Sequence, residues 1–299
     1  MGVTGFGEIA EQLRRATVLI HSENRGSDSG IIWSSDGAIV TNALFVLGAS
    51  FLLGGLRYHV QEYNRANARL QAGLLFLATV ALVIPSAIAH TNVAAGAAVT
   101  QKLSLGLAVL LLAAYGLGMV FSLQTHREFF AGTETGEADE APLPIGLALA
   151  TLAGVTVLVA LVSEIFVESV QKAAEAFGMT PAFVGFIIVA LVGGAAEMGA
   201  AFSAARKNRL DLSVGIALGS ASQLALFVAP LLVLLSYVTG PVPMDLQFWP
   251  GAVLMVLIAT MTVSSVTNNG RSTWFMGVLV LMIYCLFAMT LYLLPPRSQ

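Results

Sequence analysis

The stretch of sequence that decides the fold is ALVGGAAEMGAAFSAARKNRLDLSVGIALGSASQLALFVAPLLVLLS, residues 190–236. Its first part belongs to an apolar run, Ala182–Ala205, in which Glu197 is the one charged residue. An ionised group in the hydrocarbon region of a membrane costs at least about 2.5 to 3.5 kcal/mol, so acids inside such runs usually bind a cation or a proton. On a helix, the residues three and four positions from this acid are all small: Gly193, Gly194, Ala200 and Ala201. Small neighbours let another backbone approach the carboxylate, and the paired glycines are a weak point at which the helix can break.

The composition of the whole chain is that of a membrane protein. It is 57% hydrophobic and 10% charged, whereas soluble proteins are about 25% charged. A helix that crosses the hydrocarbon core needs about 20 apolar residues. We therefore predict an all-α polytopic protein, located in a bacterial inner membrane, with eight transmembrane spans. The predicted spans are Gly37–Leu56, Leu70–Ala89, Leu103–Leu123, Ile145–Phe166, Ala182–Ala205, Leu212–Thr239, Phe248–Val266 and Trp274–Leu294.

The charges of the loops predict how the spans are oriented. Lys and Arg are concentrated in two loops, at Arg57, Arg65 and Arg69 and at Arg206, Lys207 and Arg209. The loop between the sixth and seventh spans contains neither residue type. Short loops rich in Lys and Arg remain in the cytoplasm. Both basic loops are therefore expected on the cytoplasmic side.

The chain divides into four parts by composition. Residues 1–36 are polar with short β-like segments, residues 37–126 form a first transmembrane half, residues 127–144 form an acidic linker expected in the cytoplasm, and residues 145–299 form the second half with Glu197. The net charge of −3 gives no support for nucleic-acid binding, and the single cysteine, Cys285, excludes a disulfide within the chain.

A short repeat links the two halves. The tetrapeptide Ala-Leu-Phe-Val occurs at residues 43–46 and again at residues 225–228, and Gly37 and Gly219 precede the two copies by the same spacing. Transporters are commonly built from two related halves whose interface holds the binding site. The repeat therefore favours a transporter.

From about Asn42 to its end, the chain resembles the calcium/proton exchangers of the cation/Ca2+ antiporter superfamily. The residues that carry the resemblance are the stretch 190–236, FLLGGLRYHVQEYNRANARLQA at 51–72, SLQTH at 122–126 and Ser163-Glu164. The resemblance implies a Ca2+/H+ antiporter that is no enzyme, with Ca2+ and H+ as transported ions, no permanently bound cofactor and no catalytic residue. Its expected partners are the lipid bilayer, Ca2+ and a second copy of the chain, with no nucleic acid. Na+ remains open as the counter-ion.

The same resemblance implies a cation site. Glu197 corresponds to the cation-coordinating acid and Gln223 to its polar partner on the next helix, while Gly194 stands where Asn is common. The residues expected to surround the cation are Gly193, Gly194, Ser220 and Ser222. Thr41 and Asn42 could add neutral oxygens. Glu164 has two readings, a cation vestibule on the non-cytoplasmic side or the charged end of an interfacial helix.

The expected chemistry is a competition between two cations. Ca2+ takes about six to eight oxygen ligands, among which carboxylates supply the negative charge. Burial raises the pKa of an acid when no cation is near. Ca2+ and H+ therefore compete for Glu197, and this competition couples their transport.

The first residues resemble a different family. GSDSGIIWSSDGAIVTNA, residues 26–43, resembles the amino-terminal barrel of trypsin-like, HtrA-type serine proteases, although Leu44 stands where the catalytic His would be. Together the two resemblances imply a protease fragment joined to an exchanger whose first half, residues 37–126, is incomplete because it lacks its first acidic helix. We therefore expect little or no coupled exchange by this chain alone. The alternatives are an inactive exchanger fragment and a membrane-anchored protease. The absence of a Gly-x-Ser-x-Gly motif opposes the protease.

Overall fold

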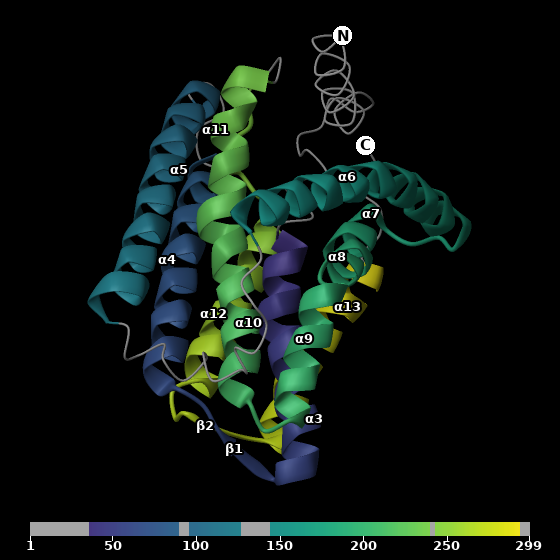
Figure 1. The fold of residues 1–299 in the computed structure, drawn as a ribbon. Helices are drawn as coiled ribbons and strands as arrows, with labels where there is room; N and C mark the ends of the chain where they lie inside the picture. The colour runs from purple at the N-terminus through teal and green to yellow at the C-terminus, as the bar shows by residue number, and fades with distance from the viewer. Residues whose placement is uncertain (1–35, 90–95, 127–143, 240–242, 294–299) are drawn as a thin grey trace.

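The computed structural model describes residues 36–89, 96–126, 144–239 and 243–293, which are almost entirely helical (Figure 1). The predicted all-α architecture is confirmed. All eight predicted spans coincide with helices, apart from short non-helical ends and Leu294, which lies outside the described residues. The helices are α3 (Leu47–Tyr58), α4 (Arg65–Ala89), α5 (Gly96–Val120), α6 (Ile145–Ala176), α7 (Pro181–Phe183), α8 (Ala190–Gly193), α9 (Ala195–Arg206), α10 (Leu210–Gln223), α11 (Ala229–Thr239), α12 (Pro250–Val266) and α13 (Trp274–Leu293).

Several of these helices join end to end into longer spans. Within the described residues, five helices are long and apolar enough to cross a membrane: Asp36–Tyr58, Arg65–Ser86, Gln101–Thr125, Leu210–Val238 and Trp274–Leu293. The bent pair Val184–Gly193 and Ala195–Arg206 makes a sixth span when its two helices are counted as one. The predicted seventh span forms the shorter helix α12, which has 17 residues.

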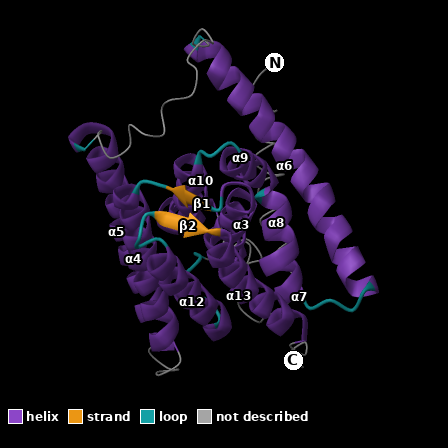
Figure 2. Ribbon diagram, turned by 90° about the horizontal axis from the view of Figure 1, so that it is seen from below, coloured by secondary structure: helices purple, strands orange, loops and turns teal. Residues whose placement is uncertain are grey.

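Helix α6 contains the predicted fourth span but has a different orientation from the other long helices. It lies across one end of the bundle in Figure 1, and the turned view of Figure 2 shows it stretched along the outside. At 32 residues it also continues past the predicted end at Phe166. No Gly or Pro lies between Phe166 and Ala176 to stop a helix, and the chain turns only at Gly178, whose φ of 65° favours glycine.

The two copies of Ala-Leu-Phe-Val have the same local backbone. Each lies in a π-helical segment inside a long span, Thr41–Val46 before α3 and Leu224–Val228 between α10 and α11. The first span ends at Tyr58 and the other begins near Arg209, and these ends meet, because the Tyr58 hydroxyl donates to the Arg206 carbonyl oxygen at 3.1 Å. The two copies therefore run in opposite directions across the bundle, as inverted repeats do.

The two basic loops lie at the same end of the bundle, as their charge predicted. Arg57 also donates to the Arg206 carbonyl oxygen at 3.2 Å, which joins one basic loop to the other. A small antiparallel sheet that the sequence did not predict covers this end, with β1 (Val60–Glu62) paired to β2 (Arg271–Thr273) (Figure 2). The positive-inside rule predicts that this end faces the cytoplasm.

Helices α3 and α13 approach each other through glycine. A Cβ atom on Gly277 would lie 2.4 Å from the Leu52 nitrogen and 2.6 Å from the Gly48 carbonyl oxygen, so no side chain fits there. A Cβ on Gly55 would likewise lie 2.3 Å from the Trp274 nitrogen. Small residues allow two membrane helices to pack backbone against backbone, where van der Waals contact replaces the missing hydrophobic driving force. This contact fixes the span that carries Asn42.

Candidate cation site

The fifth span is broken beside its acidic residue. Helix α8 ends at Gly193, α9 begins at Ala195, and the two helices are bent by 62°. Gly194 lies at the break with φ −88° and ψ 5°. Glu197 is thereby placed in the first turn of α9, where the positive end of the helix dipole favours a negative charge.

Three polar side chains from three helices meet at this point. The Ser220 hydroxyl, from α10, donates to Glu197 Oε2 at 2.6 Å. The Asn42 amide, from the first span, donates to the same Oε2 at 3.3 Å and to the Ser220 hydroxyl oxygen at 3.1 Å. Glu197 and Ser220 are half-buried, while the side chain of Asn42 is 3% exposed. We call Asn42, Glu197 and Ser220 the polar triad.

One oxygen of the triad has no hydrogen bond. Asn42 Oδ1 is buried and unpartnered among the described residues, and it faces the helix break, since a Cβ on Gly194 would lie 3.9 Å from it. A buried polar atom without a partner is costly and calls for an explanation such as an ion or water. Amides and hydroxyls can donate to a carboxylate or ligate a cation through oxygen. The triad can therefore hold either a proton or a hard cation.

The other residues expected at the site are placed around or away from the triad. Gly193 lies at the end of α8 and is exposed. Gln223 is exposed and makes no side-chain hydrogen bond within the described part of the chain. The Ser222 hydroxyl points to α4, where it donates to the Gln71 carbonyl oxygen at 3.2 Å. Glu164 lies in α6, and its side chain is not among those described.

Asn42 makes more contacts in the site than we expected from the sequence. We expected only a neutral oxygen from Thr41 or Asn42, yet the amide contacts both Glu197 and Ser220. Thr41 instead faces α13, where its hydroxyl lies 3.2 Å from the Tyr284 hydroxyl. The internal repeat was the available signal, because it pairs this part of the first span with the part of the sixth span that carries Ser220.

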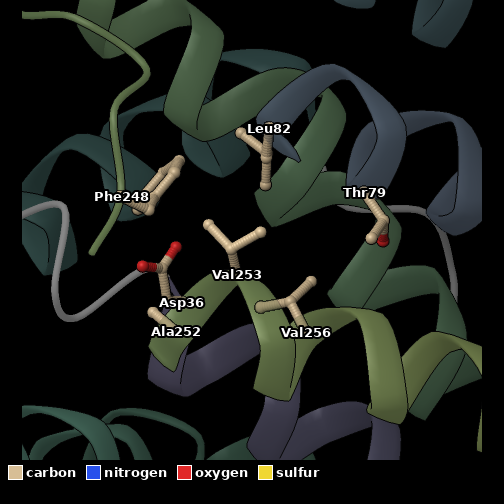
Figure 3. A pocket seen from close by; sticks show the side chains of 7 residues that line it. All are labelled: Asp36, Thr79, Leu82, Phe248, Ala252, Val253 and Val256. Atoms are coloured by element: carbon tan, nitrogen blue, oxygen red, sulfur yellow. The ribbon is translucent and has the colours of Figure 1, made fainter. Parts of the chain in front are cut away.

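An acid that is more deeply buried than Glu197 lies outside the triad. Asp36 is 2% exposed and lines a narrow pocket with mostly apolar side chains (Figure 3). The other lining residues are Thr79, Leu82, Phe248, Ala252, Val253 and Val256. Asp36 precedes Asn42 by six residues, which is about 9 Å along a helix. Asp36 was not among the residues that we expected at the cation site.

Sequence comparison decides the family. The sequence model of the sodium/calcium exchanger protein family matches residues 33–124 and 147–293, well over half of the chain. The chain belongs to the sodium/calcium exchanger family. Residues 1–35 lie outside the described residues, so their β-like structure and their likeness to a protease stay predictions.

Comparison with individual proteins supports this family assignment. A Ca2+/H+ antiporter of Aphanothece halophytica is 36% identical, covering 87% of this chain and 73% of the relative. Ca2+/H+ antiporter ChaA of Bacillus subtilis is 37% identical, covering 89% and 76%. The structure of native YfkE matches with a TM-score of 0.73 at 35% identity, covering 89% of this chain and 76% of YfkE. The H+/Ca2+ exchanger CAX, at 18% identity and a TM-score of 0.64, shares the fold.

The polar triad gives a test that separates two serines of the same helix. We expect Ser220→Ala to weaken Ca2+ binding about tenfold, because a hydrogen bond to a charged group contributes about 1.5 to 3 kcal/mol. Ser222→Ala should change the affinity less than about twofold, since its hydroxyl is bonded to α4. Isothermal titration of the purified variants with Ca2+ measures both, and equal losses would show that α10 presents a different face to the cation.

Proposed function

We propose that this protein is a Ca2+/H+ antiporter in which Ca2+ and H+ compete for Glu197. The observation that supports this most strongly is the polar triad, in which a carboxylate inside a broken membrane helix meets a hydroxyl and an amide with a free oxygen. The relatives named Ca2+/H+ antiporters support the identity of the two ions.

The ligands proposed for Ca2+ are hard oxygens. Glu197 supplies the charge, Ser220 a hydroxyl oxygen and Asn42 its free Oδ1. Ca2+ takes about six to eight such ligands, so water and backbone carbonyls would complete the shell. Gly193 and Gly194 remain the proposed source of carbonyls. Gln223 would contribute after a rotamer change, and Glu164 stays a proposed vestibule residue.

Proton coupling follows from the shared carboxylate. A protonated Glu197 is neutral and has lost one acceptor, so Ca2+ must displace its proton to bind. Conversely, protonation from the opposite side of the membrane releases Ca2+. A ligand shifts a conformational equilibrium only through its different affinity for the two states. The break at Gly194 offers the joint at which α9, with its acid, could move between them.

An uptake assay tests the proposal. Vesicles that contain the protein and have an acidic interior are expected to accumulate radioactive Ca2+, and collapse of the pH gradient with an ionophore should stop the uptake. Uptake that follows a Na+ gradient instead would identify Na+ as the counter-ion. Absence of any gradient-driven uptake would favour the inactive exchanger fragment. Comparing the uptake rate of this chain with that of a longer relative tests the expectation of little or no exchange.

A further inference from the structure

A buried glutamine holds the carboxyl-terminal end of α9, opposite the end that carries Glu197. Gln61, in β1, is 2% exposed, and its amide nitrogen donates to the Ala205 carbonyl oxygen at 3.0 Å and to Asn208 Oδ1 at 2.9 Å. The last carbonyls of a helix have no partner within the helix. Gln61 satisfies one of them, and Asn208, with φ 59°, is the left-handed residue that ends the helix.

The Gln61 amide occupies the space that a side chain on Gly54 would fill. A Cβ atom on Gly54 would lie 1.8 Å from Gln61 Oε1 and 3.2 Å from the Ala205 carbonyl oxygen. Gly54 therefore has to lack a side chain for Gln61 to reach α9 across α3. The pairing of β1 with β2, in which Gln61 lies opposite Ser272, fixes the backbone from which this side chain projects.

Other side chains also hold α9. Arg57 and Tyr58 donate to the Arg206 carbonyl oxygen at 3.2 and 3.1 Å, and the half-buried Phe202 packs edge-on against Phe45. The fully buried residues of α9 are the small side chains Ala201, Ala204 and Ala205, and burying a methyl group stabilises a helix contact by less than burying a Leu or Phe side chain. The opposite face of α9, with Gly199 and Ala200, is exposed. At its other end α9 meets the bend at Gly194. At its carboxyl end the hydrogen bond from Gln61 to the Ala205 carbonyl oxygen is buried, whereas those from Arg57 and Tyr58 are exposed to water, so Gln61 makes the contact there that water competes with least.

We propose that Gln61 is a positioning residue for Glu197. By holding the end of α9 at Ala205, it sets the direction of a short rigid helix whose first turn carries the acid, eight residues or about 12 Å away. Rotation of α9 about the bend would move the carboxylate from Ser220 and Asn42. The effect expected on Ca2+ affinity depends on the proposed function, whereas the effect on α9 does not.

Two substitutions remove this hold in different ways. Gln61→Met keeps the length of the side chain but removes both donated hydrogen bonds. Gly54→Ala keeps Gln61 but displaces its amide, and it serves if the first variant fails to fold. The matched control is Glu62→Ala, the next residue of β1, which removes an ion pair to Arg271 between two side chains that are each 70% exposed. An exposed ion pair contributes little.

Hydrogen exchange and Ca2+ titration of the full chain test the inference together. In Gln61→Met we expect the amides of α9 to exchange at least about tenfold faster while those of α12 are unchanged, and the Ca2+ Kd to rise about tenfold, which is about 1.4 kcal/mol. Glu62→Ala should match the unmodified protein in both measurements.

Combining Gln61→Met with Ser220→Ala separates positioning from a general loss of stability. If Gln61 acts by placing Glu197 against Ser220, the Ser220→Ala effect shrinks from about tenfold to under about threefold in the Gln61→Met background, because interacting sites are not additive. An undiminished tenfold effect, or exchange in α9 equal to that of Glu62→Ala, overturns the inference. If the unmodified chain binds no Ca2+, the proposed function fails, and the exchange of α9 alone decides the role of Gln61.

Discussion

Glu197→Gln is expected to abolish Ca2+ binding and Ca2+-dependent transport. The substitution keeps the shape of the side chain but removes the negative charge of the triad, and a Gln side chain has no acid proton to exchange for Ca2+. A hard divalent cation is bound mainly through carboxylate charge, so we expect a loss of about a hundredfold or more, since each factor of ten corresponds to about 1.4 kcal/mol.

Asp36→Asn is the matched control for this prediction. Both acids lie in membrane-spanning helices, but Asp36 lines a separate pocket and Glu197 contacts Asn42 and Ser220. Asp36→Asn should therefore lower Ca2+ affinity by much less than Glu197→Gln does, because the Coulomb energy between two charges falls with their distance. Equal losses from the two substitutions in a Ca2+ titration would mean that the cation site has been misplaced.

Gly277→Val should have the largest effect on folding. Its first side-chain atom would lie 2.4 Å from the Leu52 nitrogen, and backbone atoms cannot move aside as a flexible side chain can. Overpacking usually costs about 1 to 3 kcal/mol, and here α3 and α13 would have to separate along their length, so we expect about 3 kcal/mol or more.

Gly116→Val, in α5, is the control for the helix propensity of valine. A Cβ there meets nothing within 4 Å, so this variant should unfold close to the temperature of the unmodified protein. Thermal unfolding in detergent, followed by circular dichroism, compares the two. A Gly277→Val protein as stable as Gly116→Val would show that α3 and α13 do not pack as described.

The sequence predicted those features of the fold that the composition of a short stretch of chain determines. Long apolar runs without charge predicted the spans because water-free surroundings leave a helix few alternatives. Loop charges predicted that the loops at Arg57 and Arg206 share one end, and the paired glycines predicted the break at Gly194. Each of these signals is local and can be read from a window of about 20 residues.

The parts that the sequence did not predict depend on contacts between distant residues. Gln61 reads as a polar residue in a loop, and only the fold places its amide against Ala205, 144 positions away. Asn42 and Glu197 are 155 positions apart. Ser222 was expected at the site because the resemblance places it in the family's motif, but residues two positions apart on a helix, such as Ser220 and Ser222, face different ways.

The most direct test of the account is the proton release that accompanies Ca2+ binding. Purified protein in weakly buffered solutions at a series of pH values is titrated with Ca2+ while a pH indicator records released protons. If Ca2+ and H+ compete for Glu197, Ca2+ releases protons, its apparent affinity falls as the pH is lowered, and Glu197→Gln shows neither effect while Asp36→Asn shows both. Ca2+ affinity that is independent of pH, or proton release that persists in Glu197→Gln, would contradict the account.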